Sequence, residues 1–179
     1  MPDETEDFDA LVRRVDPDRW LAARFVADPG ARADLLALYA FDHELARAST
    51  VTSTPLLAEI RLTWWHEMLD EAYGALPVRR HPVAQAMADV IARRKPPRAA
   101  LDAMVDGRIA ALDGGPAAPE TDVVYAAALI LDPATPDDAT PNTLSAAAFP
   151  AALPLASRAI ANPLLKRLKL VWAVATGRL

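Results

Sequence analysis

Apolar side chains recur at every third or fourth position through much of the chain, which is the period of a helix packed on one side. Prolines that follow a capping residue mark helix starts, as at Asp16-Pro17, Asp28-Pro29 and Thr54-Pro55. Pro96-Pro97 and Gly114-Gly115 mark two of the ends. The pattern predicts five helices with short connections, over residues 18–27, 30–49, 55–73, 81–94 and 98–112. Because no segment shows the period of a strand, we expect an all-α, bundle-like array.

Changes in pattern divide the chain into four parts. They are an acidic N-terminal segment (1–15), a helical domain (16–113), a Pro-rich linker (114–143) and a C-terminal helical segment that packs on the bundle (144–179). Within the linker, only residues 123–131 are apolar, so it has room for one short helix. In the C-terminal segment, Asn162-Pro163 predicts a last helix over residues 164–176, with one apolar face and added lysines and arginines.

Composition narrows the class of protein. A net charge of −5 gives no dominant basic surface, so we expect no nucleic-acid partner. The absence of cysteine excludes disulfides, thiolate metal sites and cysteine nucleophiles. The acidic N-terminus is unlike a targeting segment, and no apolar run is long enough to span a bilayer. We therefore expect a cytoplasmic protein, with the basic last helix as the one element suited to peripheral contact with the inner membrane.

Two predicted helices each aim one charged residue at their apolar side. Asp42 shares the apolar arc of residues 30–49 with Tyr39, and Arg61 lies within the arc that holds Trp64 and Trp65. Consecutive helices joined by a short loop pack antiparallel, so we expect Asp42 to meet Arg61 in the interior. Two interpretations stay open, a structural ion pair and the remnant of a polar catalytic cavity. Under the second, these five residues are candidates for a substrate pocket.

The same residues carry a resemblance to a known family. Residues 38–47 resemble the "LYAF-x-x-E-L-A" helix of squalene/phytoene synthases, and residues 55–67 resemble the "R-x-x-W-W" helix. Residues 81–87 are similar to the "HPV-x-x-A" start, and residues 105–108 to the "I-D-G" segment. Order and spacing agree over about residues 16–113. The resemblance implies an isoprenoid-synthase α fold, here a partial bundle lacking its second half.

Active members of this family join two prenyl diphosphates with Mg²⁺ held by two Asp-x-x-x-Asp motifs. Carboxylates at i and i+4 share one helix face and chelate hard cations. The resemblance places the first pair at Ala46 and Thr50, which supply no carboxylate, and the second pair in a half that this chain replaces by the linker and tail. It therefore implies no catalytic residues and no cofactor, with Mg²⁺ expected only if prenyl synthase activity is retained.

The "AF-x-x-E-L-A" segment without an Asp pair is most similar to the non-catalytic branch that resembles complex I assembly factors. The resemblance implies a scaffold or assembly module, whose exposed bundle face binds a protein partner or a second copy. The alternative is a prenyl diphosphate-binding protein, or a head-to-head prenyl synthase that takes its acidic motifs from a partner chain.

One pair of carboxylates has chelating spacing. Asp102 and Asp106 lie at i and i+4, but a lone pair without a facing partner is usually a solvated helix face, so they are weak metal candidates. The three histidines, at positions 43, 66 and 81, share no metal-ligand spacing. We expect no metal site.

Overall fold

The structure, a computed structural model, describes residues 7–50, 54–115, 120–139, 144 and 148–151. Within these ranges the protein is all helical, as the pattern predicts, and no strand is present. The elements are α1 (Phe8–Val15), α2 (Pro17–Ala23), α3 (Pro29–Thr50), α4 (Pro55–Tyr73), α5 (Pro82–Arg94), α6 (Arg98–Leu112), α7 (Glu120–Leu131) and a short 3₁₀ helix, η1 (Phe149–Ala151).

Side-chain caps explain where the first helices begin. The Asp16 carboxylate accepts a hydrogen bond from the Arg19 amide (3.0 Å), and the Asp28 carboxylate accepts one from the Ala31 amide (2.7 Å). Each cap satisfies an amide that has no partner inside its own helix. The five predicted helices correspond to α2 through α6, and every predicted start lies within one residue of the observed one.

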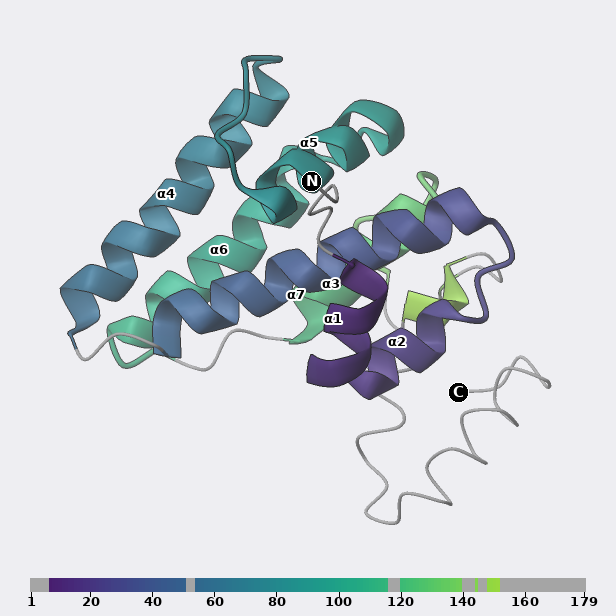
Figure 1. The fold of residues 1–179 in the computed structure, drawn as a ribbon, viewed down its shortest axis with the longest axis horizontal. Coiled ribbons are helices and arrows are strands. Elements are labelled where there is room, and N and C mark those ends of the chain that lie inside the picture. The colour runs from purple at the N-terminus through teal and green to yellow at the C-terminus, as the bar shows by residue number, and fades with distance from the viewer. Residues whose placement is uncertain (1–6, 51–53, 116–119, 140–143, 145–147, 152–179) are drawn as a thin grey trace, which may run out of the picture.

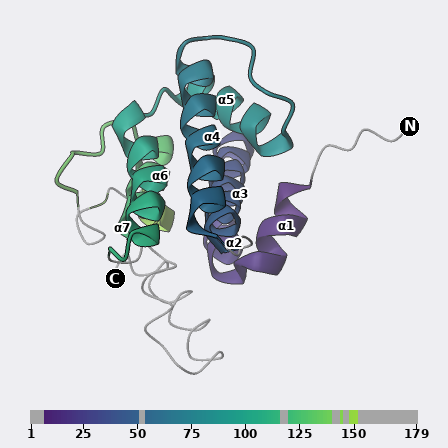
Figure 2. The same cartoon turned by 90° about the vertical axis from the view of Figure 1, so that its left-hand side faces the viewer.

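Helix α3 is the centre of the array. It packs against α1, α2, α4, α5, α6 and α7, while α4 lies at one edge and contacts α3, α5 and α6 (Figures 1 and 2). Every residue from Asp34 to Asp42 is buried, so α3 has no solvent-exposed face along its middle. Apart from Asp34 and Asp42, whose carboxylates pair with arginines, this stretch is apolar on all sides, in contrast to a surface helix with one apolar stripe.

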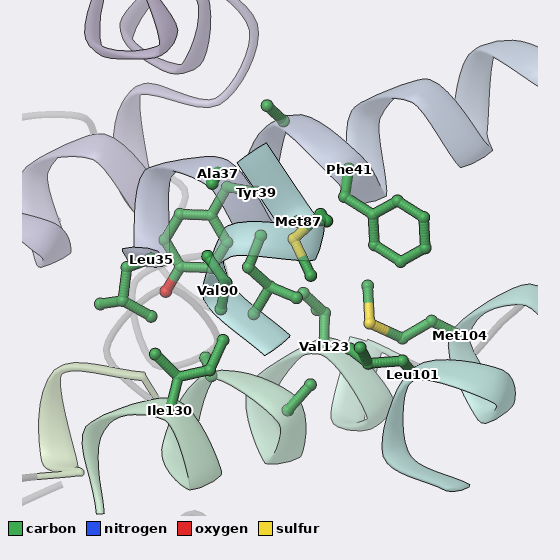
Figure 3. Close-up of a cluster of buried hydrophobic side chains, with 14 of the residues drawn as sticks. Leu35, Ala37, Tyr39, Phe41, Met87, Val90, Leu101, Met104, Val123 and Ile130 are labelled. Atoms are coloured by element: carbon green, nitrogen blue, oxygen red, sulfur yellow. The ribbon is translucent and has the colours of Figure 1, made fainter. Parts of the chain in front are cut away.

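The core fills the space between α3 and the helices around it. Figure 3 shows part of it, with side chains contributed by α3, α5, α6 and α7. Its largest fully buried side chains include Phe41, Leu45, Met68, Met87 and Ile130. Such close-packed side chains are the main source of stability in a helical domain.

Two segments outside residues 16–113 also belong to this core. The short helix for which the linker has room, at residues 123–131, is present as α7 (Glu120–Leu131), but it contributes seven buried side chains to the core, so this part of the chain is not a linker. In the acidic N-terminal segment, Asp7 caps α1, which buries Leu11 and Val12. The proline-rich flanks of α7 and the acidic context of α1 gave no sign of this burial, although both helices bury apolar residues at helical spacing.

The C-terminal part of the sequence is described only at residue 144 and around η1. The predicted helix at 164–176 therefore lies outside the described residues. Among the helices that are described, none combines the length and the apolar character needed to cross a bilayer.

Candidate functional site

A buried ion triad joins three helices at the middle of the array. Asp42 on α3 accepts hydrogen bonds from Nη1 of Arg19 on α2 (2.5 Å) and Nη2 of Arg108 on α6 (2.9 Å). Asp42 and Arg19 are each 8% exposed, whereas the Arg108 side chain is 27% exposed. We call Arg19, Asp42 and Arg108 the buried triad. Because each carboxylate oxygen has a guanidinium partner, the charge of Asp42 is compensated in the interior.

Arg61 is not part of this triad, and its predicted pairing with Asp42 is wrong. The side of α4 that faces the core carries Ala58, Leu62, Trp65 and Leu69, whereas Arg61 is exposed. The predicted apolar arc of α4 was rotated by about one residue, since Leu57 and Ile60 within it are 50% and 57% exposed. The two arginines that do reach Asp42 come from helices on either side of α3 in the sequence.

The triad shifts the pKa values of its neighbourhood. Burial by itself would raise the pKa of Asp42, but attraction to Arg19 and Arg108 outweighs it and holds the pKa below its ordinary value. Burial raises the pKa of Tyr39, whose ring lies 5.4 Å from the Arg19 guanidinium carbon. Asp42 is therefore ionised and Tyr39 neutral at physiological pH.

A cavity of about 280 Å³ opens beside the triad. It is lined by Val15, Asp16, Arg19, Tyr39, Asp42, His43, Ala46, Met104, Arg108, Glu120, Asp122 and Val123, and we call it the polar cavity. The Tyr39 hydroxyl is buried and has no hydrogen-bond partner among the described residues. A guest in this cavity could exchange a hydrogen bond with that hydroxyl.

Ala46 and Thr50, the two positions where the family resemblance implies carboxylate ligands, supply none. Ala46 lies in the cavity wall, one helical turn beyond Asp42, and offers no ligand atom. Thr50 is exposed, and its hydroxyl donates to the Ala46 carbonyl oxygen (2.9 Å). Among the described residues, no group of three or more His, Asp or Glu side chains could hold a metal ion.

A second hollow lies against a different side of α3. It measures about 430 Å³, is more open, and is lined by Glu44, Arg47, Ala48, Ile60, Arg61, Trp64, Trp65 and His81. We call it the apolar groove. Its wall is an aromatic cluster in which Trp65 contacts Trp64 and His81 edge-on, with ring centres 4.7 and 5.2 Å apart. These contacts hold the indole rings in place, and Trp64 remains partly exposed.

The five pocket candidates therefore do not form one site. Tyr39 and Asp42 line the polar cavity, while Arg61, Trp64 and Trp65 line the apolar groove. On α3 the cavity uses positions 39, 42, 43 and 46, and the groove uses 44, 47 and 48, which point to different sides of one helix.

Of the weak metal candidates, Asp106 hydrogen-bonds to His66, and Asp102 lies near the same ring and pairs with Arg98. Asp106 lies 2.9 Å from His66 Nε2, and Asp102 lies 3.4 Å from His66 Nδ1 and 3.0 Å from Arg98 Nε. Because the two carboxylates meet opposite nitrogens of the ring, they do not converge on one point where a cation could sit.

Sequence analysis missed Arg19, Arg108 and His66. Arg108 closes the segment at 105–108 that carries the family resemblance, which was a usable signal. Arg19 follows a helix cap and has no distinguishing spacing, so only the packing of α2 on α3 reveals its role.

Comparison with protein families adds one finding to this geometry. The family model for squalene/phytoene synthase matches residues 12–126, which include α2 to α6 and half of α7. Searches among curated proteins and among solved structures give no match.

Proposed function

Because the chain belongs to the squalene/phytoene synthase family, we propose that it is a member without prenyl transferase activity that acts as a scaffold or assembly module. The observation that carries this proposal is Ala46 in the wall of the polar cavity. At that position the family pattern requires the first carboxylate of a magnesium-binding pair, and Thr50 stands at the second.

Magnesium chemistry needs oxygen ligands that are free to turn to the cation. Asp42 lies one turn from Ala46, but both of its oxygens already accept hydrogen bonds from the buried triad's arginines. Freeing this carboxylate would leave the buried guanidinium of Arg19 without its closest partner and the part-buried Arg108 without its ion pair, at a cost of several kcal/mol. Asp42 is therefore a poor replacement for the family's ligand.

The same pairing argues against tight binding of a diphosphate. Arg19 and Arg108 are the cations of the polar cavity, and Asp42 neutralises part of their charge. The lining also carries the carboxylates of Asp16, Glu120 and Asp122, which repel phosphate oxygens. Prenyl diphosphate binding, the alternative to a scaffold, is thus disfavoured by charge.

Purified full-length chain incubated with Mg²⁺ and farnesyl or geranylgeranyl diphosphate tests this proposal. We expect no squalene, hydroxysqualene or phytoene under conditions where an active family member makes product. Calorimetric titration with each diphosphate measures binding separately from turnover. Product formation by the chain would overturn the proposal, and diphosphate binding without product would favour the alternative.

Within the family, the "AF-x-x-E-L-A" segment at residues 40–46 supports assignment to the assembly-factor-like branch. We propose a protein partner for this module and a location in the cytoplasm or at the periphery of the inner membrane. The exposed apolar residues of α4, described next, favour a binding role over a purely structural one.

A further inference from the structure

Helix α4 presents an apolar face to solvent along one wall of the apolar groove. Leu57, Ile60, Arg61 and Trp64 follow the i, i+3, i+4, i+7 spacing of one helix face, and Leu56 borders them. Leu56, Leu57 and Ile60 are 65%, 50% and 57% exposed. We call Leu57, Ile60, Arg61 and Trp64 the α4 face.

This face is distinct from the side of α4 that holds the array together. α4 packs on α3, α5 and α6 through Ala58, Leu62, Trp65 and Leu69, and it lies at the edge of the molecule (Figure 1). Trp64 packs partly against the core, and the groove floor includes the buried Trp65 and Ala48, but Leu57 and Ile60 lie outside the core and remain half exposed. Exposed apolar area of this kind is costly in water and typically marks a binding surface.

The charges around the groove indicate the chemistry of its occupant. Arg47 is bound to Glu44 (2.7 Å), and Arg79, which stacks over Trp64, is bound to Glu67 and Glu71. Arg61 has no ion pair or hydrogen bond within the part of the chain that the structure describes. One unpaired guanidinium among apolar side chains is complementary to a single carboxylate on an apolar partner.

We propose that the apolar groove binds an amphipathic helix of a partner protein, which lays apolar side chains along the α4 face and pairs an aspartate or glutamate with Arg61. The groove would be the partner-binding surface of the proposed scaffold, so this inference rests on that function. Helix-in-groove recognition uses the same i, i+3, i+4, i+7 anchors that the α4 face presents.

Three other occupants fit the groove less well: a second copy of the chain, the chain's own residues 164–176, and a lipid bilayer. A second copy docked symmetrically brings another Arg61 into the same contact. The chain's own residues 164–176, which lie outside the described part, would bring Lys166, Arg167 and Lys169 to a face that already has an unpaired cation. A bilayer presents a broad surface, whereas the groove is a hollow between helices.

Two synthetic helical peptides of about 16 residues test the proposal. Both carry leucines at i, i+3, i+4 and i+7, and one has glutamates and the other lysines beside them. Fluorescence anisotropy with the full-length chain should show the glutamate peptide binding about fivefold or more tightly than the lysine peptide. Arg61→Glu should reverse this preference, and Ile60→Asp should abolish binding of both peptides.

Two matched variants show whether these effects belong to the groove. Arg14→Glu makes the same charge change on α1, and Leu76→Asp makes the same polarity change at a side chain that is 59% exposed, close to the 57% of Ile60. Both should bind the glutamate peptide like wild type, and circular dichroism should show unchanged helix content in all four variants.

Three results would overturn the proposal. The first is that the two peptides bind equally well or that neither binds. The second is a dimer, seen by sedimentation, that Ile60→Asp dissociates. The third is that the chain binds neither peptide but binds phosphatidylglycerol vesicles, and that Ile60→Asp removes this vesicle binding. The prenyl diphosphate assay is independent of these outcomes. If the chain makes product but still prefers the glutamate peptide, only the scaffold function is refuted. If the chain makes no product and shows no preference for the glutamate peptide, only the proposed helix binding in the groove is refuted.

Discussion

Asp42 is a carboxylate in the most buried stretch of the chain, and its ionised state depends on two arginines distant in sequence. Transferring the charges of Asp42 and Arg19 from water into the interior costs several kcal/mol per ion, which their pairing with each other and with the part-buried Arg108 offsets. Removal of one member therefore has a larger effect than the net contribution of the triad, because the remaining charges stay buried. This asymmetry makes Asp42 the residue most sensitive to substitution at the site.

Asp42→Ala should lower the free energy of unfolding by about 3–5 kcal/mol, since Arg19 and Arg108 lose their common partner. Chemical denaturation with circular dichroism measures it. The matched control is Glu44→Ala on the same helix, which removes the more exposed pair with Arg47 and should cost at most about 1 kcal/mol. Equal effects of the two substitutions would show that the triad is solvated.

The depressed pKa of Asp42 predicts a specific pH dependence. Its stabilising effect is fully present above the unfolded-state pKa, about 4, and is lost as the pH falls through the lower folded-state pKa. Below about pH 4 the wild-type chain should lose stability more steeply than Asp42→Asn, which has no carboxylate to protonate. Denaturation midpoints between pH 2 and 6 test this, and parallel curves for the two proteins would contradict it.

Residue-level prediction from the sequence succeeded for Asp42 and failed for its partner. An acidic residue inside an apolar arc predicts a buried, paired charge whatever the fold, because an unpaired one is too costly. The identity of the partner depends on which helices surround α3. Arg61 was the nearest candidate along the chain, but Arg19 and Arg108 are brought in by α2 and α6.

At the scale of helices, local sequence signals were sufficient to predict where a helix begins when proline marks its start. Pro17, Pro29, Pro55 and Pro82 each open a helix, and Lys95, with φ of 51°, closes α5 before Pro96. These signals act within a few residues, so they do not depend on the rest of the fold. The rotation of α4 depends on its neighbours, which is why its core-facing side was misjudged.

Helix α7 provides a test at this scale, because its sequence context is typical of a linker. Ile130 is completely buried, and Ile130→Ala should cost about 2–5 kcal/mol through lost apolar contacts and a new cavity. Ile60→Ala makes the same change at an exposed site and should alter stability by less than about 0.5 kcal/mol. Thermal unfolding of both variants decides the matter; a silent Ile130→Ala would mean that α7 does not belong to the core.

Over the whole molecule, the two hollows lie on different sides of α3. The polar cavity contains Ala46, a position where the family resemblance implies a carboxylate, and the apolar groove lies apart from it. The family and the all-α class followed from motifs and periodicity within α2 to α6. The separation of Tyr39 and Asp42 from Trp64 and Trp65 could not be predicted, because it depends on how α4 is rotated against α3.

The enclosure of α3 has a consequence for how the protein exchanges hydrogen with water. Backbone amides between Asp34 and Asp42 are covered by side chains from the surrounding helices, so no local fluctuation of α3 alone can expose them. Their exchange with deuterium should require separation of the whole array, and its rate then reports the global free energy of unfolding. Amides in the first turn of α4, beside the exposed Leu56 and Leu57, should exchange by fraying long before that event.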